Sequence, residues 1–317
     1  MAENAHAILV PLDGSPAGEH ALPAAIGVAR ASGAALRLAH VVPVGASAAD
    51  RQRSQAYLSA VAQRIQSLAG VAAETAVLED IHHAAHHGEP GVVASPRRAV
   101  AHALAAAAEQ PGVELVAMTT HGRSDISRFW LGSVTEHLIH HAPAPLLLVQ
   151  PGSAAPDLAA SVAFRRILVP LDGSQAAEQM LERAIAFGQP WGACYYLLHA
   201  IDLQLEETIA TLAPVPTTQS EIETEAEQAR AYMEQAARPL HDRQLDVKTD
   251  VLLGTPVAAV ILGYAAERQV DLIAIKTHGR GGFARLVLGS TADKVLRAAQ
   301  VPVLLHRPAL APARPAS

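Results

Sequence analysis

Two segments of the chain combine residue types that could hold a phosphate group. They share two glycines with nine residues between them, an arginine after the first glycine and a serine after the second: Gly122, Arg123, Gly132 and Ser133, then Gly279, Arg280, Gly289 and Ser290. The two copies match without a gap at one offset (279 − 122 = 157 and 289 − 132 = 157). Each lies between an apolar, strand-like run and a helix-like run, where backbone N–H groups can cradle a phosphate.

Simpler structural interpretations exist for the same residues. The glycines could serve only as turn and helix-cap residues. Ser133 and Ser290 each precede an acidic residue by three positions, which is the spacing of a capping box. Arg123 and Arg280 could face solvent, or they could pair with a phosphate. A capping serine can still face an anion, so the two interpretations of the serines are compatible.

Other chemistry has little support in the sequence. Neither glycine segment ends in the Gly-Lys-Ser/Thr of a P-loop, so no Mg²⁺-clamping site is indicated. The histidine-rich stretch 82–87 could ligate Zn²⁺ or Ni²⁺, but it has no counterpart in the second half and favours a solvated loop. No grouping of nucleophile, base and acid recurs in both halves. We therefore expect no catalytic residue and no required metal.

Alternating strands and helices must position these residues. The expected strands of the first half are 7–12, 35–42, 72–78, 113–118 and 145–149, and those of the second half are 167–171, 193–199, 247–253, 271–275 and 302–306. The expected helices are 16–31, 50–68, 95–109 and 132–141, then 175–188, 219–240, 255–268 and 291–299. Continuous apolar strands between helices indicate a parallel sheet that is covered on both faces.

The sequence thus predicts two similar, doubly wound, five-stranded α/β domains. They would occupy residues 1–150 and 165–307, joined by a linker at 151–164 and followed by a disordered tail at 308–317. Ligands of such sheets bind at the carboxyl ends of the strands. Asp13, Asp172 and both glycine segments fall at such ends, so we expect them to share one crevice.

Composition narrows the classes of function. Half of the 317 residues are hydrophobic but only 3% are aromatic, so the cores must be aliphatic. The net charge of −6 argues against bulk binding of nucleic acid or of an anionic membrane. A single cysteine, Cys194, excludes an intrachain disulfide and fits a reducing compartment. No apolar run approaches the roughly 20 residues of a membrane span. We expect a cytoplasmic, soluble protein.

The chain resembles the universal stress protein family in its tandem two-domain form. The resemblance covers nearly the whole chain. It depends on Val-Pro-Leu-Asp-Gly-Ser at 10–15 and 169–174 and on the two glycine segments. Nucleotide-binding members of the family carry Gly, two residues, Gly, nine residues, Gly and then Ser or Thr. Here Thr119 and Lys276 replace the first glycine.

The resemblance implies a Rossmann-like, adenine nucleotide α-hydrolase-like fold and a site for ATP or AMP in one or both halves. Asp13 and Asp172 would accept a hydrogen bond from the adenine amino group, although the residues alone also fit a simple turn. Backbone groups near Val41 and Ala200 would complete the base pocket. For Lys276 three alternatives stay open: its side chain faces solvent, fills the groove, or pairs with a nucleotide phosphate.

The implied function is regulation of a stress response through a nucleotide-bound and an unbound state. A partner-binding protein without nucleotide is one alternative, and a slow ATP hydrolase is another. The terminal strand of each half is short and apolar, and such an edge needs a cover. Family members pair these strands across a dimer, so we expect an intrachain pseudo-dimer in which Leu147 and Leu304 lie close together. A homodimer of the whole chain also stays open.

Overall fold

The expected strands join into one continuous sheet. The computed structural model describes residues 6–79, 96–121, 131–160, 162–202, 219–276 and 288–306. These residues form a ten-stranded sheet of order β3-β2-β1-β4-β5-β10-β9-β6-β7-β8. The strands are β1 (Ala7–Pro11), β2 (Ala35–Val42), β3 (Ala73–Glu79), β4 (Val113–Thr119), β5 (Leu146–Val149), β6 (Arg166–Pro170), β7 (Cys194–Ile201), β8 (Val247–Leu253), β9 (Leu272–Lys276) and β10 (Val303–His306).

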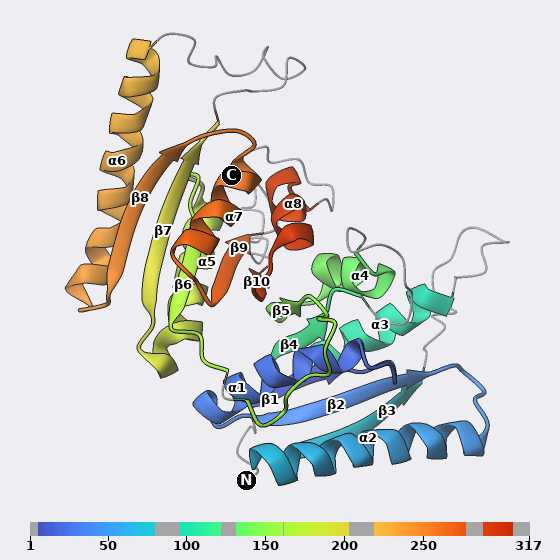
Figure 1. Cartoon of the computed structure of the whole chain (residues 1–317). Helices are drawn as coiled ribbons and strands as arrows, with labels where there is room; N and C mark the ends of the chain where they lie inside the picture. The colour runs from blue at the N-terminus through green and yellow to red at the C-terminus, as the bar shows by residue number, and fades with distance from the viewer. Residues whose placement is uncertain are drawn as a thin grey trace, which may run out of the picture.

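The two halves meet through their terminal strands. Within each half the paired strands are parallel, whereas β5 and β10 are antiparallel, with Leu147 opposite Leu304. Figure 1 shows this pair in the middle of the molecule and the strands β3 and β8 at the two ends of the sheet. The expected pairing of the terminal strands is confirmed, and it leaves neither apolar strand as an open edge.

Helices cover both faces of the sheet, as the continuous apolar strands predict. Ile8 and Val10 of β1 belong to one buried cluster, whereas Leu9 belongs to the cluster on the opposite face. The first face carries α1 (Leu22–Ser32), α2 (Ala48–Ala69), α5 (Gln175–Gly188) and α6 (Gln219–Asp242), and the second carries α3 (Pro96–Ala108), α4 (Ser133–His141), α7 (Val257–Glu267) and α8 (Ser290–Ala298). Both clusters contain residues from both halves.

The first helix begins later than expected. We expected it to begin after Ser15, but the chain forms a short 3-10 helix at Gly18–Ala21, and α1 begins only at Leu22. Pro23 explains the difference, because its ring would clash with the carbonyl of Glu19 in a continuous α-helix. Proline is tolerated in the first turn of α1, where its missing N–H would have no partner.

The segment that joins the halves packs against both of them. Leu158 and Phe164 are 2% and 1% exposed within the first cluster. The side-chain amide of Gln150 donates to the carbonyl oxygens of Leu296 and Arg297, at 3.0 and 2.8 Å, near the end of α8. Gln150, which directly precedes the linker, therefore satisfies carbonyls of a helix end, which have no partner inside the helix.

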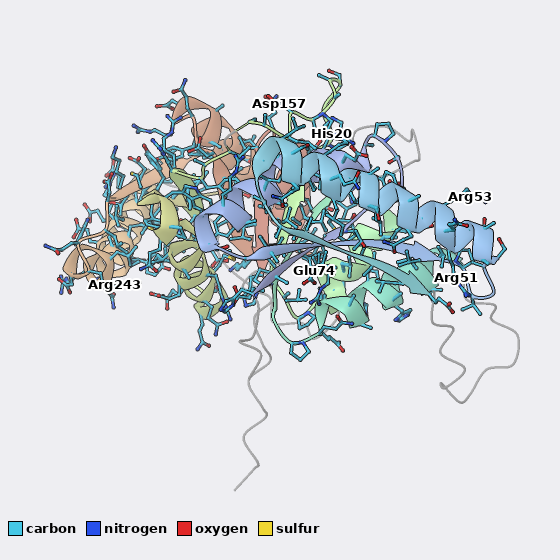
Figure 2. The ribbon with its side chains drawn as sticks, turned by 90° about the horizontal axis from the view of Figure 1, so that it is seen from below. His20, Arg51, Arg53, Glu74, Asp157 and Arg243 are labelled. Carbon is cyan, nitrogen blue, oxygen red and sulfur yellow. The ribbon has the colours of Figure 1, made fainter. Side chains whose placement is uncertain are left out.

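Contacts with the first half fix the other side of this segment. His20 hydrogen-bonds the carbonyl of Ala154 through Nε2 at 2.7 Å. In Figure 2, His20 and Asp157 lie on the same side of the molecule, away from Arg243 at the end of the second half. A methyl group added at Gly27 of α1 would lie 2.4 Å from the carbonyl oxygen of Val162.

Gly27→Ala should destabilise the protein by about 1–3 kcal/mol, because the added methyl group must displace the backbone at Val162. Gly263→Ala is a matched control in α7, since nothing lies within 4 Å of the added carbon there. That control should gain up to about 1 kcal/mol from helix propensity. Urea unfolding of both variants measures the difference, and equal stability of the two would contradict the tight packing of the linker.

Two histidines are held in their neutral form by the fold. His137 of α4 lies between His102 of α3, at a ring-centroid distance of 4.5 Å, and His141, which stacks on it at 3.9 Å. Burial and the neighbouring positive groups lower the pKa of His137 to about 4. Burial and Arg183 likewise lower the pKa of His306, the last residue of β10, to about 4.

The free energy of unfolding should therefore fall as the pH drops from about 6.5 toward 4. In this window the unfolded chain protonates His137 and His306 while the folded chain keeps them neutral, so proton uptake favours unfolding. The penalty is absent above the ordinary histidine pKa and grows until the pH reaches the folded value.

Urea unfolding at pH 7 and pH 5 measures this loss of stability. His137→Gln and His306→Gln should each make the loss smaller. The same substitution at His241, which is exposed on α6, is the control and should leave the loss unchanged. If all three variants lose as much stability as the unaltered chain, these histidines do not carry the pH dependence.

Candidate functional site

A fixed aspartate lies at a strand end in each half. Asp13 follows β1, and its Oδ1 accepts hydrogen bonds from the backbone N–H and the hydroxyl of Ser15, at 2.9 and 2.6 Å. Asp172 follows β6, and its Oδ1 accepts a hydrogen bond from the N–H of Ser174 at 3.1 Å. The turn expected from Asp-Gly-Ser is thus present twice, and it orients both carboxylates.

The strand ends that carry the two aspartates point in opposite directions. All pairs within a half are parallel, but β5 and β10 run in opposite directions. The carboxyl ends of β1 and β4 therefore point one way, and those of β6 and β9 point the other way. A crevice shared by both halves, as expected from the sequence, is wrong. Each half has its own strand-end site.

In the second half, the predicted residues surround one cavity of about 170 Å³. Its lining includes five of them: Asp172, Ala200, Lys276, Gly289 and Ser290. Leu198, Val257 and Ile261 form part of its apolar wall. The lining thus combines an acid and a base with the start of α8. This combination of an apolar wall with a few convergent polar groups is typical of a ligand site.

The first half has the same elements in the same order. Asp13 follows β1, Val41 lies near the end of β2, and Gly132 and Ser133 begin α4. Val41 is paired in register with Leu78 of β3, as Ala200 is paired with Leu252 of β8. The predicted residues therefore occupy equivalent positions in the two halves.

The helix starts differ from the expected capping boxes. Gly132 and Gly289 are the N-caps, and neither α4 nor α8 has a side-chain cap. Ser133 and Ser290 are the first helical residues, and both are exposed. The capping-box prediction is wrong by one position, because the extended glycine and not the serine is the N-cap. The acidic residue is then the fourth helical residue, whereas a capping box requires it at the third. First-turn N–H groups without a side-chain acceptor are suited to bind an anion.

Several predicted residues lie outside the described part of the chain. They are Gly122, Arg123, Gly279, Arg280 and the histidine stretch 82–87. The structure does describe the two ends of the first glycine segment, which are joined by a hydrogen bond from the N–H of Gly132 to the carbonyl of Thr120 at 2.9 Å. Thr135 lies beneath it, with its hydroxyl 3.3 Å from the carbonyl oxygen of Thr119.

Lys276 turns into the strand-end groove of the second half. It is 9% exposed, and its ammonium group donates to Oδ2 of Asp172 and to the hydroxyl of Ser174. The solvent-facing alternative is therefore wrong, and the side chain fills space beside the carboxylate. Pairing of this ammonium with a nucleotide phosphate stays a prediction.

The ion pair keeps Asp172 charged although it is partly buried. Burial raises the pKa of Asp172, but hydrogen bonds from Lys276 and Ser174 and the charge of Lys276 outweigh it and hold that pKa below its usual value. The carboxylate that the family resemblance assigns to adenine is thus already bound by a side chain of the same half.

Sequence reasoning missed a polar network beside Asp13. Glu19 is 9% exposed and accepts hydrogen bonds from Arg64 at 2.9 Å and from Tyr57 at 3.1 Å. A methyl group added at Gly18 would lie 2.7 Å from Oδ1 of Asp13, so this network borders the site. An acid in the otherwise uncharged stretch 14–29 was a signal, but its partners on α2 are far away in sequence.

Two features are absent from the described ranges. No group of three or more His, Cys, Asp or Glu side chains there is arranged to hold a metal ion. No helix in those ranges is both long and apolar enough to cross a membrane.

Known proteins are similar to this chain in sequence and in architecture. The model of the universal stress protein family matches residues 4–150 and again residues 163–307. A universal stress protein of Mycobacterium tuberculosis is 28% identical over 323 residues, which cover 98% of this chain and 97% of that protein. Another, of Mycolicibacterium smegmatis, is 29% identical over 196 residues. That match spans 62% of this chain and only 62% of the M. smegmatis protein.

Solved structures agree on the fold. A universal stress protein from Archaeoglobus fulgidus has a TM-score of 0.63 and 21% identity, covering 97% of this chain and 99% of that chain. At this identity the similarity supports the architecture alone. The family match, in contrast, covers both halves and includes the segments that carry the strand-end residues. The chain belongs to the universal stress protein family, with two copies of the family domain in tandem.

Proposed function

We propose that this protein regulates a stress response by binding an adenine nucleotide, ATP or AMP, at the strand carboxyl ends of its first half. The observation that carries the proposal is the strand-end region of the first half, where the oriented carboxylate of Asp13 follows β1 and the uncapped start of α4 lies at Gly132 and Ser133. The equivalent residues of the second half line a cavity with an apolar wall.

Each group has a distinct chemical task in this proposal. The carboxylate of Asp13 accepts a hydrogen bond from the adenine amino group, and Ser15 holds the carboxylate in place. Backbone groups near Val41 contact the base. The N–H groups that begin α4 and the hydroxyl of Ser133 bind phosphate oxygens. Gly122 and Arg123 belong to the same phosphate site in the family pattern.

Regulation, rather than turnover, fits these residues. The tasks are all tasks of binding, and the network of Glu19, Arg64 and Tyr57 is internally paired. The bound and unbound forms would differ at the exposed start of α4, where a protein partner could distinguish them. We further propose that the two halves act as an intrachain pseudo-dimer through β5 and β10.

The alternative of a partner-binding protein without nucleotide is favoured by one observation, which concerns the second half. There Lys276 occupies the carboxylate of Asp172. This alternative predicts that neither half binds nucleotide, whereas the main proposal predicts binding that depends on Asp13.

Asp13→Ala should weaken binding of ATP and AMP by about 1–3 kcal/mol, or roughly 5- to 150-fold in Kd, because a hydrogen bond between the base and a carboxylate is lost. Titration calorimetry on the full chain measures the affinity. Asp157→Ala is the matched control. Asp157 is exposed, and its carboxylate likewise accepts a local backbone hydrogen bond, from Ala159 at 2.9 Å.

Asp157→Ala should bind both nucleotides like the unaltered chain. Thermal unfolding of each variant confirms that loss of the turn has not unfolded the first half. The proposal fails if the unaltered chain binds neither ATP nor AMP at millimolar concentration. It also fails if Asp13→Ala, while folded, binds both as tightly as before.

A further inference from the structure

Thr119 and Lys276 occupy the same place in the two halves. Thr119 ends β4 opposite Val149, and Lys276 ends β9 opposite His306. Each residue of the second pair lies 157 positions after its counterpart in the first pair (276 − 119 = 157 and 306 − 149 = 157). Sequence and strand register therefore give the same equivalence. The two strand-end sites therefore differ at a position that borders the strand-end groove.

The side chains at this position make different contacts. The hydroxyl of Thr119 donates to the carbonyl of His121, on its own segment, at 2.8 Å. Lys276 instead reaches across to the turn after β6 and binds both Asp172 and Ser174. The longer side chain thus reaches the carboxylate that a bound base would need.

An adenine amino group would compete poorly for this carboxylate. It is a neutral donor, so its bond to the carboxylate has one charged partner, whereas the ammonium and the carboxylate form an ion pair in which both partners are charged. The side chain of Lys276 is 10% exposed and that of Asp172 is 37% exposed, so moving the ammonium away would break a half-buried ion pair. The competing donor is also attached to the protein and loses no translational freedom.

The space that remains beside Lys276 is also small. The cavity beside Lys276 measures about 170 Å³, whereas sites for complete small-molecule ligands occupy roughly 300–1,000 Å³. Apolar side chains and the start of α8 still line this cavity. The second half thus has the architecture of the site, with the position of the base amino group already taken.

We propose that the ammonium group of Lys276 binds Asp172 in place of the adenine amino group and so closes the second strand-end site to adenine nucleotides. The chain then binds one nucleotide, in its first half. This inference rests on the proposed function of the first half. It assigns the difference between the halves to one side chain, which determines how many nucleotides the chain binds.

Calorimetric stoichiometry with ATP tests this directly. The unaltered chain should bind one ATP. Lys276→Thr, which installs the residue of the first half, should bind two. Thr119→Lys, the reciprocal change, should reduce the number to zero. The double variant Thr119→Lys/Lys276→Thr should bind one again, now in the second half.

Lys294→Thr is the matched control. Lys294 is exposed on α8, so this variant loses the same charge and the same side chain outside the cavity. It should bind one ATP. Circular dichroism and thermal unfolding establish that each variant is folded before its stoichiometry is compared.

Each result separates this inference from the proposal on which it rests. Two ATP bound by the unaltered chain would overturn the closure, and this result needs no variant. A folded Lys276→Thr that binds as many ATP as the unaltered chain would also overturn it. No binding by the unaltered chain but one ATP bound by Lys276→Thr would support the closure and refute the first-half site. No binding by either would refute both.

Discussion

The antiparallel pairing of β5 with β10 is the interaction on which the rest of the structure depends. Leu147 and Leu304 face each other there and are 0% and 2% exposed. Each half alone would end in a short apolar edge with unpaired backbone groups, which invites aggregation. The pairing satisfies those groups and joins the buried clusters of the two halves on both faces of the sheet.

The direction of this pairing also determines where the sites lie. Because β5 and β10 are antiparallel, the strand carboxyl ends of the two halves point in opposite directions. The two sites are therefore separate in space.

The joining segment adds a second constraint between the halves. Gln150 binds carbonyls near the end of α8, and Val162 lies against Gly27 of α1. The segment has the composition of a flexible linker, yet Phe164 is buried against Phe187 and Trp191, with ring centroids 5.3 Å from each. The few aromatic residues of the chain are thus concentrated in part where the linker enters the second half.

Local sequence determined the strands, the helices, the doubly wound order and the duplication, because apolar runs, turn residues and a repeat offset are properties of neighbouring residues. It also located Asp13, Asp172 and the glycine segments at strand ends. Tertiary structure alone decided three features. The opposite placement of the sites follows from a long-range strand pairing, and the network around Glu19 joins residues 38 and 45 positions apart. The hydrogen-bond partner of Lys276 could not be predicted from the sequence for the same reason. Its partner Asp172 lies 104 residues earlier, and only the neighbouring ends of β6 and β9 bring the ammonium and the carboxylate together.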